Sequence, residues 1–232
     1  MARGGAAVTS VLLVEDDALL REATLLSLER YGYEVDVAAD GLTGLSRFRR
    51  RVPDVAVVDV MLPGLDGVSL VRRMRAESDL PVVMISARTD PVDVVLGLEA
   101  GADDYVTKPF DVPVLIARIR SAVRRTARPD GPVTEHGPSP MAFGDLVIDP
   151  AGLEVSRAGR PLRLTPTELR LLLTFAAHPA TVLSRTTLLE RVWDHAGGGD
   201  GRLVDVHVQR LRRKIGGERI VTVRGFGYRF EH

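Results

Sequence analysis

Acidic side chains follow two of the apolar runs in the first half of the chain. Glu15, Asp16 and Asp17 come directly after the first run, and Asp59 ends the third. If these runs are parallel strands, their carboxyl ends meet in a crevice at one edge of the sheet. Carboxylates held close together repel one another unless a cation lies among them, and oxygen ligands suit Mg²⁺. The sequence therefore predicts a magnesium site built from acids that are distant along the chain.

Two further polar side chains end runs on the same side. Ser86 follows the fourth run and Lys108 follows the fifth. A hydroxyl group and an ammonium group can bind the oxygens of a transferred phosphoryl group. Solvated side chains scattered over loops would explain any one of these residues. They do not explain why the required residue types stand at so many strand ends.

The elements that must position these residues alternate between short apolar runs and longer periodic ones, which is typical of βα units around a parallel sheet. Five strands are predicted, at Val11–Val14, Glu34–Ala38, Val55–Asp59, Pro81–Ile85 and Asp104–Thr107. Five helices are predicted, at Ala18–Tyr31, Gly41–Arg50, Asp66–Arg75, Pro91–Ala100 and Pro113–Arg125. We therefore expect an α/β fold with a doubly wound, five-stranded parallel sheet.

The segment Thr126–Met141 is rich in proline and glycine and has no apolar period, so we interpret it as a linker. After it, three short strands are predicted at Phe143–Ile148, Leu153–Ser156 and Leu162–Leu164. Thr165, Pro166 and Glu168 are a strong signal for the start of a helix. Helices are predicted to about Ala177, at Ser184–Asp194 and at Arg202–Ile215, before a hairpin at Ile220–Val223 and Gly227–Phe230.

The helix Arg202–Ile215 is amphipathic and basic. Val204, Val208, Leu211 and Ile215 form one apolar stripe. The opposite face should carry Arg202, Val206, Gln209, Arg210 and Arg213, with Asp205, His207, Arg212 and Lys214 on its flanks. A third helix followed by a hairpin with Arg224 at its tip is the order of a winged helix, which places the helix in the major groove of DNA and the hairpin near the minor groove.

Composition agrees with a nucleic-acid partner. The net charge of the chain is zero, but residues 1–125 carry 16 basic and 19 acidic side chains, whereas residues 202–232 carry 8 and 3. The absence of cysteine excludes disulfides and thiolate metal sites. We find no apolar run long enough for a membrane span and no apolar leader in Met1–Ser10, so a cytoplasmic protein without a membrane partner is expected.

Several motifs resemble one family closely and in order. VLLVEDD, PDVAVVDVMLPGLDG, PVVMISAR and GADDYVTKPF resemble the receiver domain of two-component response regulators. TPTELRLLL, RLVDVHVQRLRRKI and TVRGFGYRF resemble the winged-helix output domain of the OmpR/PhoB class, within which the chain is similar to actinobacterial cell-envelope-stress regulators. The resemblance implies a flexible arm at 1–10, a receiver at 11–125, a linker at 126–141 and a winged-helix DNA-binding domain at 142–232.

By this resemblance, Asp59 is the phosphoacceptor. Glu15, Asp16 and the backbone carbonyl of Met61 join it as ligands of Mg²⁺, whereas Asp17 matches a variable position. Ser86, Tyr105 and Lys108 would bind the phosphoryl group or switch in response to it, and the Lys108–Pro109 bond is expected to be cis. The implied partners are a sensor histidine kinase, double-stranded DNA with a direct-repeat or palindromic operator, and RNA polymerase.

The resemblance also implies two surfaces. The DNA-binding residues would be Arg202, Val206, His207, Gln209, Arg210, Arg212, Arg213, Thr222 and Arg224. Phosphorylation would favour a homodimer through Val94, Glu99, Asp103, Asp104, Val114, Arg118, Arg120 and Arg125. Valine replaces the charged residue usual in the class at both 94 and 114, so we expect an apolar contact between the two chains there, unless both valines pack within their own chain.

Three hypotheses remain open on the sequence alone. The first is a transcription factor controlled by phosphorylation, and the second is a DNA-binding protein whose receiver works without phosphorylation. The third is a phosphatase of the haloacid-dehalogenase type, which also uses an aspartyl nucleophile. That enzyme class needs a second aspartate two residues after the nucleophile, and this position is Met61. The first hypothesis, a switch rather than a metabolic enzyme, agrees best with the residues.

Overall fold

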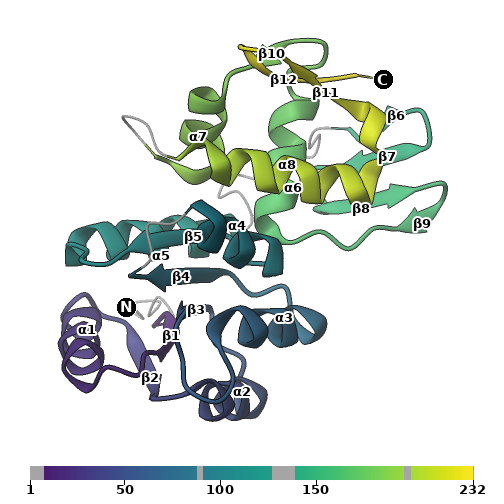
Figure 1. Cartoon of the computed structure of the whole chain (residues 1–232). Helices are drawn as coiled ribbons and strands as arrows, with labels where there is room; N and C mark the ends of the chain where they lie inside the picture. The colour runs from purple at the N-terminus through teal and green to yellow at the C-terminus, as the bar shows by residue number, and fades with distance from the viewer. Residues whose placement is uncertain (1–7, 88–90, 127–138, 196–199, 232) are drawn as a thin grey trace, which may run out of the picture. The chain divides into compact units, whose positions relative to one another are not determined.

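The computed structural model describes residues 8–87, 91–126, 139–195 and 200–231, and the chain divides into two compact units (Figure 1). The first unit extends to Val123 and the second begins at Arg124. The predicted arm and linker fall largely on residues 1–7 and 127–138, which lie outside the described residues.

The first unit is built on one parallel sheet with the strand order β2-β1-β3-β4-β5. Its strands are β1 Ser10–Val14, β2 Glu34–Ala38, β3 Val55–Asp59, β4 Val82–Ser86 and β5 Asp104–Thr107. Strand β3 is therefore central, with β1 on one side and β4 on the other. All five predicted strands are confirmed within one residue at each end. This order brings the ends of β1, β3, β4 and β5 to one edge of the sheet.

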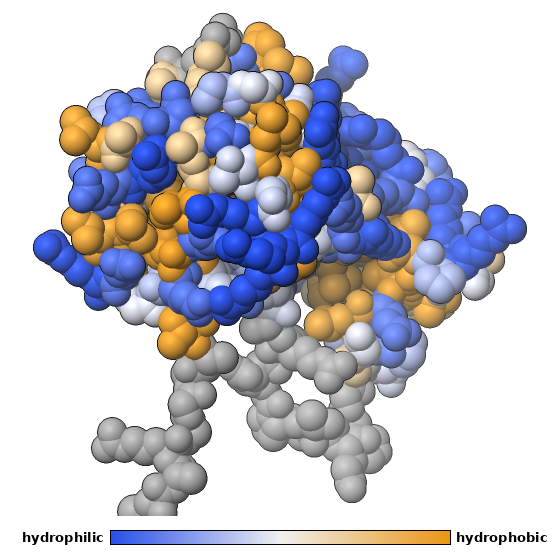
Figure 2. Space-filling view, turned by 90° about the horizontal axis from the view of Figure 1, so that it is seen from below, coloured by the Kyte–Doolittle hydropathy of each residue, from blue (hydrophilic) through white to orange (hydrophobic). Residues whose placement is uncertain are grey.

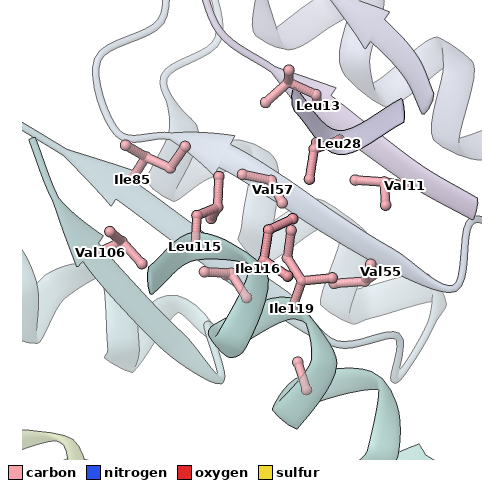
Figure 3. Packing of buried hydrophobic residues seen from close by; sticks show 12 residues of the cluster. Val11, Leu13, Leu28, Val55, Val57, Ile85, Val106, Leu115, Ile116 and Ile119 are labelled. Atoms are coloured by element: carbon pink, nitrogen blue, oxygen red, sulfur yellow. The ribbon is translucent and has the colours of Figure 1, made fainter. Parts of the chain in front are cut away.

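Helices cover both faces of this sheet. They are α1 Ala18–Arg30, α2 Gly41–Arg50, α3 Gly67–Glu77, α4 Pro91–Ala100 and α5 Val112–Thr126. Figure 3 shows Leu28 of α1 and Leu115, Ile116 and Ile119 of α5 packed with strand residues such as Val57. On the other face, a Cβ added to Gly44 of α2 would lie 2.9 Å from Val14, and one added to Gly97 of α4 would lie 2.8 Å from Met84. The helices therefore sandwich the sheet, as the doubly wound prediction requires.

Three of these helices begin with an aspartate whose side chain accepts a backbone hydrogen bond. Asp17, Asp40 and Asp66 are the N-caps of α1, α2 and α3. Each carboxylate accepts from the amide three residues later, which satisfies a donor that the helix itself leaves unpaired.

Much of the surface seen in Figure 2 is hydrophilic, with small hydrophobic areas between. On the first unit, ion pairs contribute to this character, among them Arg49 with Glu77 and Arg51 with Glu34. Large hydrophobic side chains such as Leu19 and Leu26 are exposed on α1.

The described residues of the second unit from 139 onward form two antiparallel sheets and three α-helices. Its strands are β6 Met141–Phe143, β7 Leu146–Asp149, β8 Glu154–Arg157, β9 Arg160–Pro161, β10 Val182–Leu183, β11 Ile220–Val223 and β12 Gly227–Phe230. Strands β6 to β9 form one sheet, and β12 lies between β10 and β11 in the other. The hairpin β11–β12 is confirmed as predicted.

Two strand predictions in this unit were wrong. The single strand expected at Phe143–Ile148 is two strands, β6 and β7, because Gly144 adopts a φ of +61° and reverses the chain. The strand expected at Leu162–Leu164 ends earlier, as the two-residue β9 at Arg160–Pro161. The short β10 had no alternating pattern to reveal it.

The helices of the second unit are α6 Pro166–Ala176, α7 Arg185–Trp193 and α8 Gly201–Ile215, followed by the 3₁₀ turn η1 Gly217–Arg219. The predicted capping box is present at α6, where Thr165 and Glu168 exchange hydrogen bonds. Phe230 of β12 packs edge-on against Phe143 at 5.0 Å between ring centroids and also stacks on Phe175 of α6. Helix α8 packs against both α6 and α7.

Candidate functional site

The carboxylates predicted to converge do so around one lysine. Lys108 Nζ lies 2.9 Å from Glu15 Oε1, 2.7 Å from Glu15 Oε2 and 2.5 Å from Asp59 Oδ2. Asp59 Oδ1 accepts a hydrogen bond of 2.9 Å from the backbone amide of Met61. Glu15 and Asp59 are buried and Asp16 is exposed. Ligand oxygens of these three acids lie within 4.8 Å of one another.

The electrostatics of this cluster follow from its burial. Burial raises the pKa of Glu15 to about 7, because the hydrogen bond and the charge of Lys108 lower the pKa less than burial and the nearby charge of Asp59 raise it. Burial alone would lower the pKa of Lys108, but hydrogen bonds to Asp59 and Glu15 outweigh it, and the pKa of Lys108 is raised. Lys108 therefore remains an ammonium group beside two carboxylates that disfavour each other's charge.

Asp17 and Arg21 orient the loop that carries the acids. The Asp17 side chain accepts from the Leu20 amide at 2.9 Å, so it caps α1, as expected of a residue outside the ligand set. Arg21 Nη1 donates to the carbonyl oxygens of Glu15 at 2.7 Å and Asp16 at 3.0 Å. Arg21 was not predicted as a residue of this site. Its position in the first turns of α1, soon after the acids, could have indicated that its side chain reaches the loop that carries them.

The remaining residues predicted at this edge lie on β4 and β5. Ser86 is buried at the end of β4, and its carbonyl accepts from the Lys108 amide at 2.7 Å. Tyr105 is half-buried on β5, opposite Met84 of β4. The Lys108–Pro109 peptide bond is cis, which confirms that expectation.

The residues predicted for a dimer surface fall into two groups. Glu99, Val114 and Arg120 are exposed, and the Arg120 guanidinium lies 5.7 Å from the centroid of the Tyr31 ring. Asp103, in contrast, is fully buried; it pairs with Arg75 of α3 and accepts from the Val82 amide at 2.9 Å. The prediction that Asp103 faces a partner chain was therefore wrong, because it connects α3 with the start of β4.

The other charged residues of that prediction are also partly engaged within the chain. Asp104 is buried, with Arg118 Nε 4.0 Å from its Oδ2. Arg125 is buried near the end of α5. Val94 is buried on α4, one turn before Leu98, whereas Val114 is 43% exposed. Of the two valines, only Val114 therefore offers apolar surface to a partner, whereas Val94 packs within its own chain, as the alternative interpretation allowed.

Helix α8 exposes fewer of the predicted DNA-binding residues than its sequence pattern indicates. Gln209 and Arg213 are exposed, and Arg202 and Arg212 are partly so. Val206 and Arg210 are buried, so their predicted place on the exposed face was wrong; His207, predicted on the flank as a DNA contact or a structural residue, is buried as well. The reason is that α8 packs against both α6 and α7, which covers a wider arc of the helix than the stripe of four apolar residues.

Two of the buried residues have clear structural partners. The His207 ring packs edge-on against Trp193 of α7 at 5.0 Å between centroids, and its Nδ1 lies 2.8 Å from the Leu203 carbonyl oxygen. Arg210 Nη2 lies 3.2 Å from Glu168 Oε1. Glu168, at 0% exposed, also accepts from Lys214 Nζ at 2.6 Å. These side chains hold the three helices together.

The hairpin β11–β12 presents its predicted residues to solvent. Thr222 and Arg224 are exposed, as is Phe226 next to the tip. Arg212 of α8 donates to Thr222 Oγ1 at 2.8 Å and to the Ile220 carbonyl at 2.7 Å. The exposed residues of α8 and the hairpin are therefore connected through Arg212.

Comparisons with known proteins match both units. The response regulator receiver domain family matches residues 11–120, and the family described as transcriptional regulatory protein, C terminal, matches residues 159–230. The transcriptional regulatory protein CseB of Streptomyces coelicolor is 62% identical over 229 residues, covering 96% of this chain and 98% of CseB. The DNA-binding response regulator MtrA of Mycolicibacterium smegmatis is 43% identical, covering 94% of this chain and 95% of MtrA.

Solved structures agree with these matches. A RitR mutant superposes with a TM-score of 0.70 at 25% identity, covering 96% of this chain and 98% of that one. The response regulator DrrB of Thermotoga maritima, titled an OmpR/PhoB homolog, has a TM-score of 0.51 at 30% identity, with coverages of 97% and 100%. Among the described residues, no helix combines the length and apolar character needed to cross a membrane.

Proposed function

The chain belongs to the OmpR/PhoB class of two-component response regulators, and we propose that a sensor histidine kinase phosphorylates it on Asp59 to control its binding to DNA. The observation that carries this proposal is the convergence of Glu15, Asp59 and Lys108 at the ends of three strands. In the reaction, an Asp59 oxygen forms a bond to phosphorus while the bond from phosphorus to the donor nitrogen breaks, and the nitrogen keeps the electron pair. Lys108 would hold the phosphoryl oxygens as a point charge.

The donor set of the cluster fits Mg²⁺. Two buried carboxylates and one exposed carboxylate offer oxygen ligands within 4.8 Å of one another, and burial together with the charge of Asp59 raises the pKa of Glu15. Glu15, Asp16, Asp59 and the carbonyl of Met61 would hold the ion. When bound, Mg²⁺ would offset negative charge on the carboxylates and on the phosphoryl group. Ser86 would bind a phosphoryl oxygen, and Tyr105 would change position with it.

The output is proposed to be transcription control through sequence-specific binding to double-stranded DNA. Helix α8 would enter the major groove with Gln209 and Arg213 outward, flanked by Arg202 and Arg212, while Thr222 and Arg224 of the hairpin would contact the backbone and the minor groove. The operator would be a direct repeat or a palindrome bound by two chains, and RNA polymerase would be the further partner. Such a regulator works in the cytoplasm.

Phosphorylation would favour a homodimer through α4, β5 and α5. The residues that support this proposal are the exposed Glu99, Val114 and Arg120 and the partly exposed Arg118. Exposed ion pairs contribute about 0–1 kcal/mol each, so a dimer of this kind depends on several contacts together.

One incubation separates this function from its alternatives. The chain is mixed with a small acyl phosphate and Mg²⁺, and its intact mass is followed over time. A stable gain of one phosphoryl group that is absent from the Asp59→Asn variant supports the proposal. No gain would indicate a receiver that works without phosphorylation, and rapid release of phosphate with no lasting gain would indicate a phosphatase.

A further inference from the structure

Arg185, the first residue of α7, reaches across to α8 and to the hairpin. Its Nε donates to Asp205 Oδ1 at 2.7 Å, and its Nη2 donates to the Tyr228 hydroxyl at 3.3 Å. The Tyr228 hydroxyl donates in turn to Asp205 Oδ1 at 2.7 Å. The Arg185 guanidinium also lies 5.0 Å from the centroid of the Tyr228 ring. Three elements thus meet at one arginine.

A second guanidinium lies against the same ring. That of Arg212 is 5.4 Å from the Tyr228 centroid, and Arg212 donates to Thr222, which is proposed above as a DNA contact. The group therefore contains two cations and one carboxylate. The side chains of Arg185 and Asp205 are 37% and 42% exposed, so solvent and a ligand can reach both.

We propose that Arg185 binds a backbone phosphate of DNA and that, in the absence of DNA, Asp205 holds the Arg185 guanidinium in position. This inference rests on the DNA-binding function proposed above. A guanidinium has five N–H donors in a planar fork that suits phosphate oxygens, and its cation–π contact with the Tyr228 ring helps to hold the group in place. An exposed arginine–aspartate pair contributes little to stability, so a phosphate can compete for the cation.

A purely structural role for Arg185 makes a different prediction. If the Arg185–Asp205 pair serves only to hold α7 on α8, removal of either partner disturbs the same contact. Both variants would then weaken DNA binding. If Arg185 is a phosphate ligand, the two variants act in opposite directions, because Asp205 places a negative charge beside the same phosphate.

The test measures binding to a duplex of mixed sequence over a range of salt concentrations. We expect Arg185→Ala to weaken binding roughly tenfold, the effect of one charge-assisted hydrogen bond. The slope of log K against log salt should fall in magnitude by about 0.9, the value for one phosphate contact. Asp205→Asn should strengthen binding. Arg160→Ala is the matched control, since it removes an exposed arginine from β9 in the other sheet.

The folded state of each variant is checked by the fluorescence of Trp193, the single tryptophan of the chain. If Arg185→Ala lowers the unfolding midpoint, Arg185→Gln, which can still donate to Asp205, takes its place. The inference is overturned if both Arg185 and Asp205 variants weaken binding, or if the Arg185 variant matches Arg160→Ala. If the unmodified chain does not bind the duplex even at low salt, the proposed DNA-binding function itself fails.

Discussion

The two units each hold a cluster of three charged side chains whose carboxylates are buried, and the two clusters have an opposite balance of charge. The receiver cluster, Glu15, Asp59 and Lys108, holds two carboxylates around one ammonium group. The capping cluster, Glu168, Arg210 and Lys214, holds two cations around one carboxylate. In the capping cluster the carboxylate also accepts from the Thr165 amide, so an amide and two cations of its own domain surround it. The receiver cluster has excess negative charge at the open edge of a sheet.

This difference separates a binding site from a structural support. A buried charge needs partners, and where the fold surrounds a carboxylate with cations the group holds elements together. Where burial and a second carboxylate raise the pKa of the first, as burial and Asp59 do for Glu15, an external cation has a place to bind. Burial of charge does not distinguish the two clusters. They differ in the ratio of carboxylates to cations and in their position in the fold.

The largest effect is expected from removing the one carboxylate of the capping cluster. Glu168→Gln keeps the side-chain shape and the hydrogen bonds of the capping box, but it removes the negative charge that pairs with the buried Arg210. Breaking a buried pair in this way costs about 3–5 kcal/mol. Urea unfolding followed by Trp193 fluorescence reports this unit. Glu154→Gln, on the exposed side of β8, is the control, and an equal loss in both variants would contradict the role of Glu168.

The receiver cluster should respond to a cation instead. Mg²⁺ at about one hundred times its Kd should add about 2.7 kcal/mol to the unfolding free energy of the first unit. Circular dichroism of the whole chain should detect this gain, while the Trp193 transition of the second unit stays in place. Asp16→Asn should reduce the gain. A shift of the Trp193 transition by Mg²⁺ would place the ion in the wrong unit.

The receiver cluster was predictable because its residues follow strands whose parallel direction the sequence pattern indicates. Once Val55–Asp59 is assigned as a parallel strand, the place of Asp59 at the sheet edge follows without side-chain detail, although the central position of this strand came only from the structure. The cis bond before Pro109 was likewise expected from resemblance and is present. Fold class and the convergence of the acids therefore came from local pattern and sheet topology.

The capping cluster was not predictable in the same way. A helical period gives the centre of the buried face of α8 but not its width, which depends on the contacts of α8 with α6 and α7. Arg210 lies far from the centre of that stripe and is buried beside Glu168, an ion-pair partner that is distant along the chain. Asp103 was misassigned for the same reason, since its partner Arg75 is distant along the chain.

Because Gln209 is exposed on α8 and Arg210 is buried, their substitutions should affect DNA binding differently. Gln209→Ala should cost about 1–3 kcal/mol against the cognate duplex and relax preference at one base pair, because an amide side chain can read a base edge. Arg224→Ala should weaken binding to cognate and scrambled duplexes alike, since a contact with backbone or minor groove reads little sequence.

Arg210→Met should instead lower the unfolding free energy of the second unit. Loss of preference at one base pair by Arg210→Met without loss of stability would restore Arg210 as a base-reading residue.

The smallest effect expected concerns the acid next to the receiver cluster. Asp17 accepts the Leu20 amide as the N-cap of α1 and is exposed, so Asp17→Ala should destabilise the first unit by about 1 kcal/mol. Phosphorylation of Asp59 and the stabilisation by Mg²⁺ should be unchanged, because a capping carboxylate directed at its own helix does not join the ligand set. Asp17→Asn, which retains the cap, should restore the stability. A weaker response to Mg²⁺ in both variants would instead show that Asp17 contributes negative charge to the ion, and the receiver cluster would then extend one residue further along the loop.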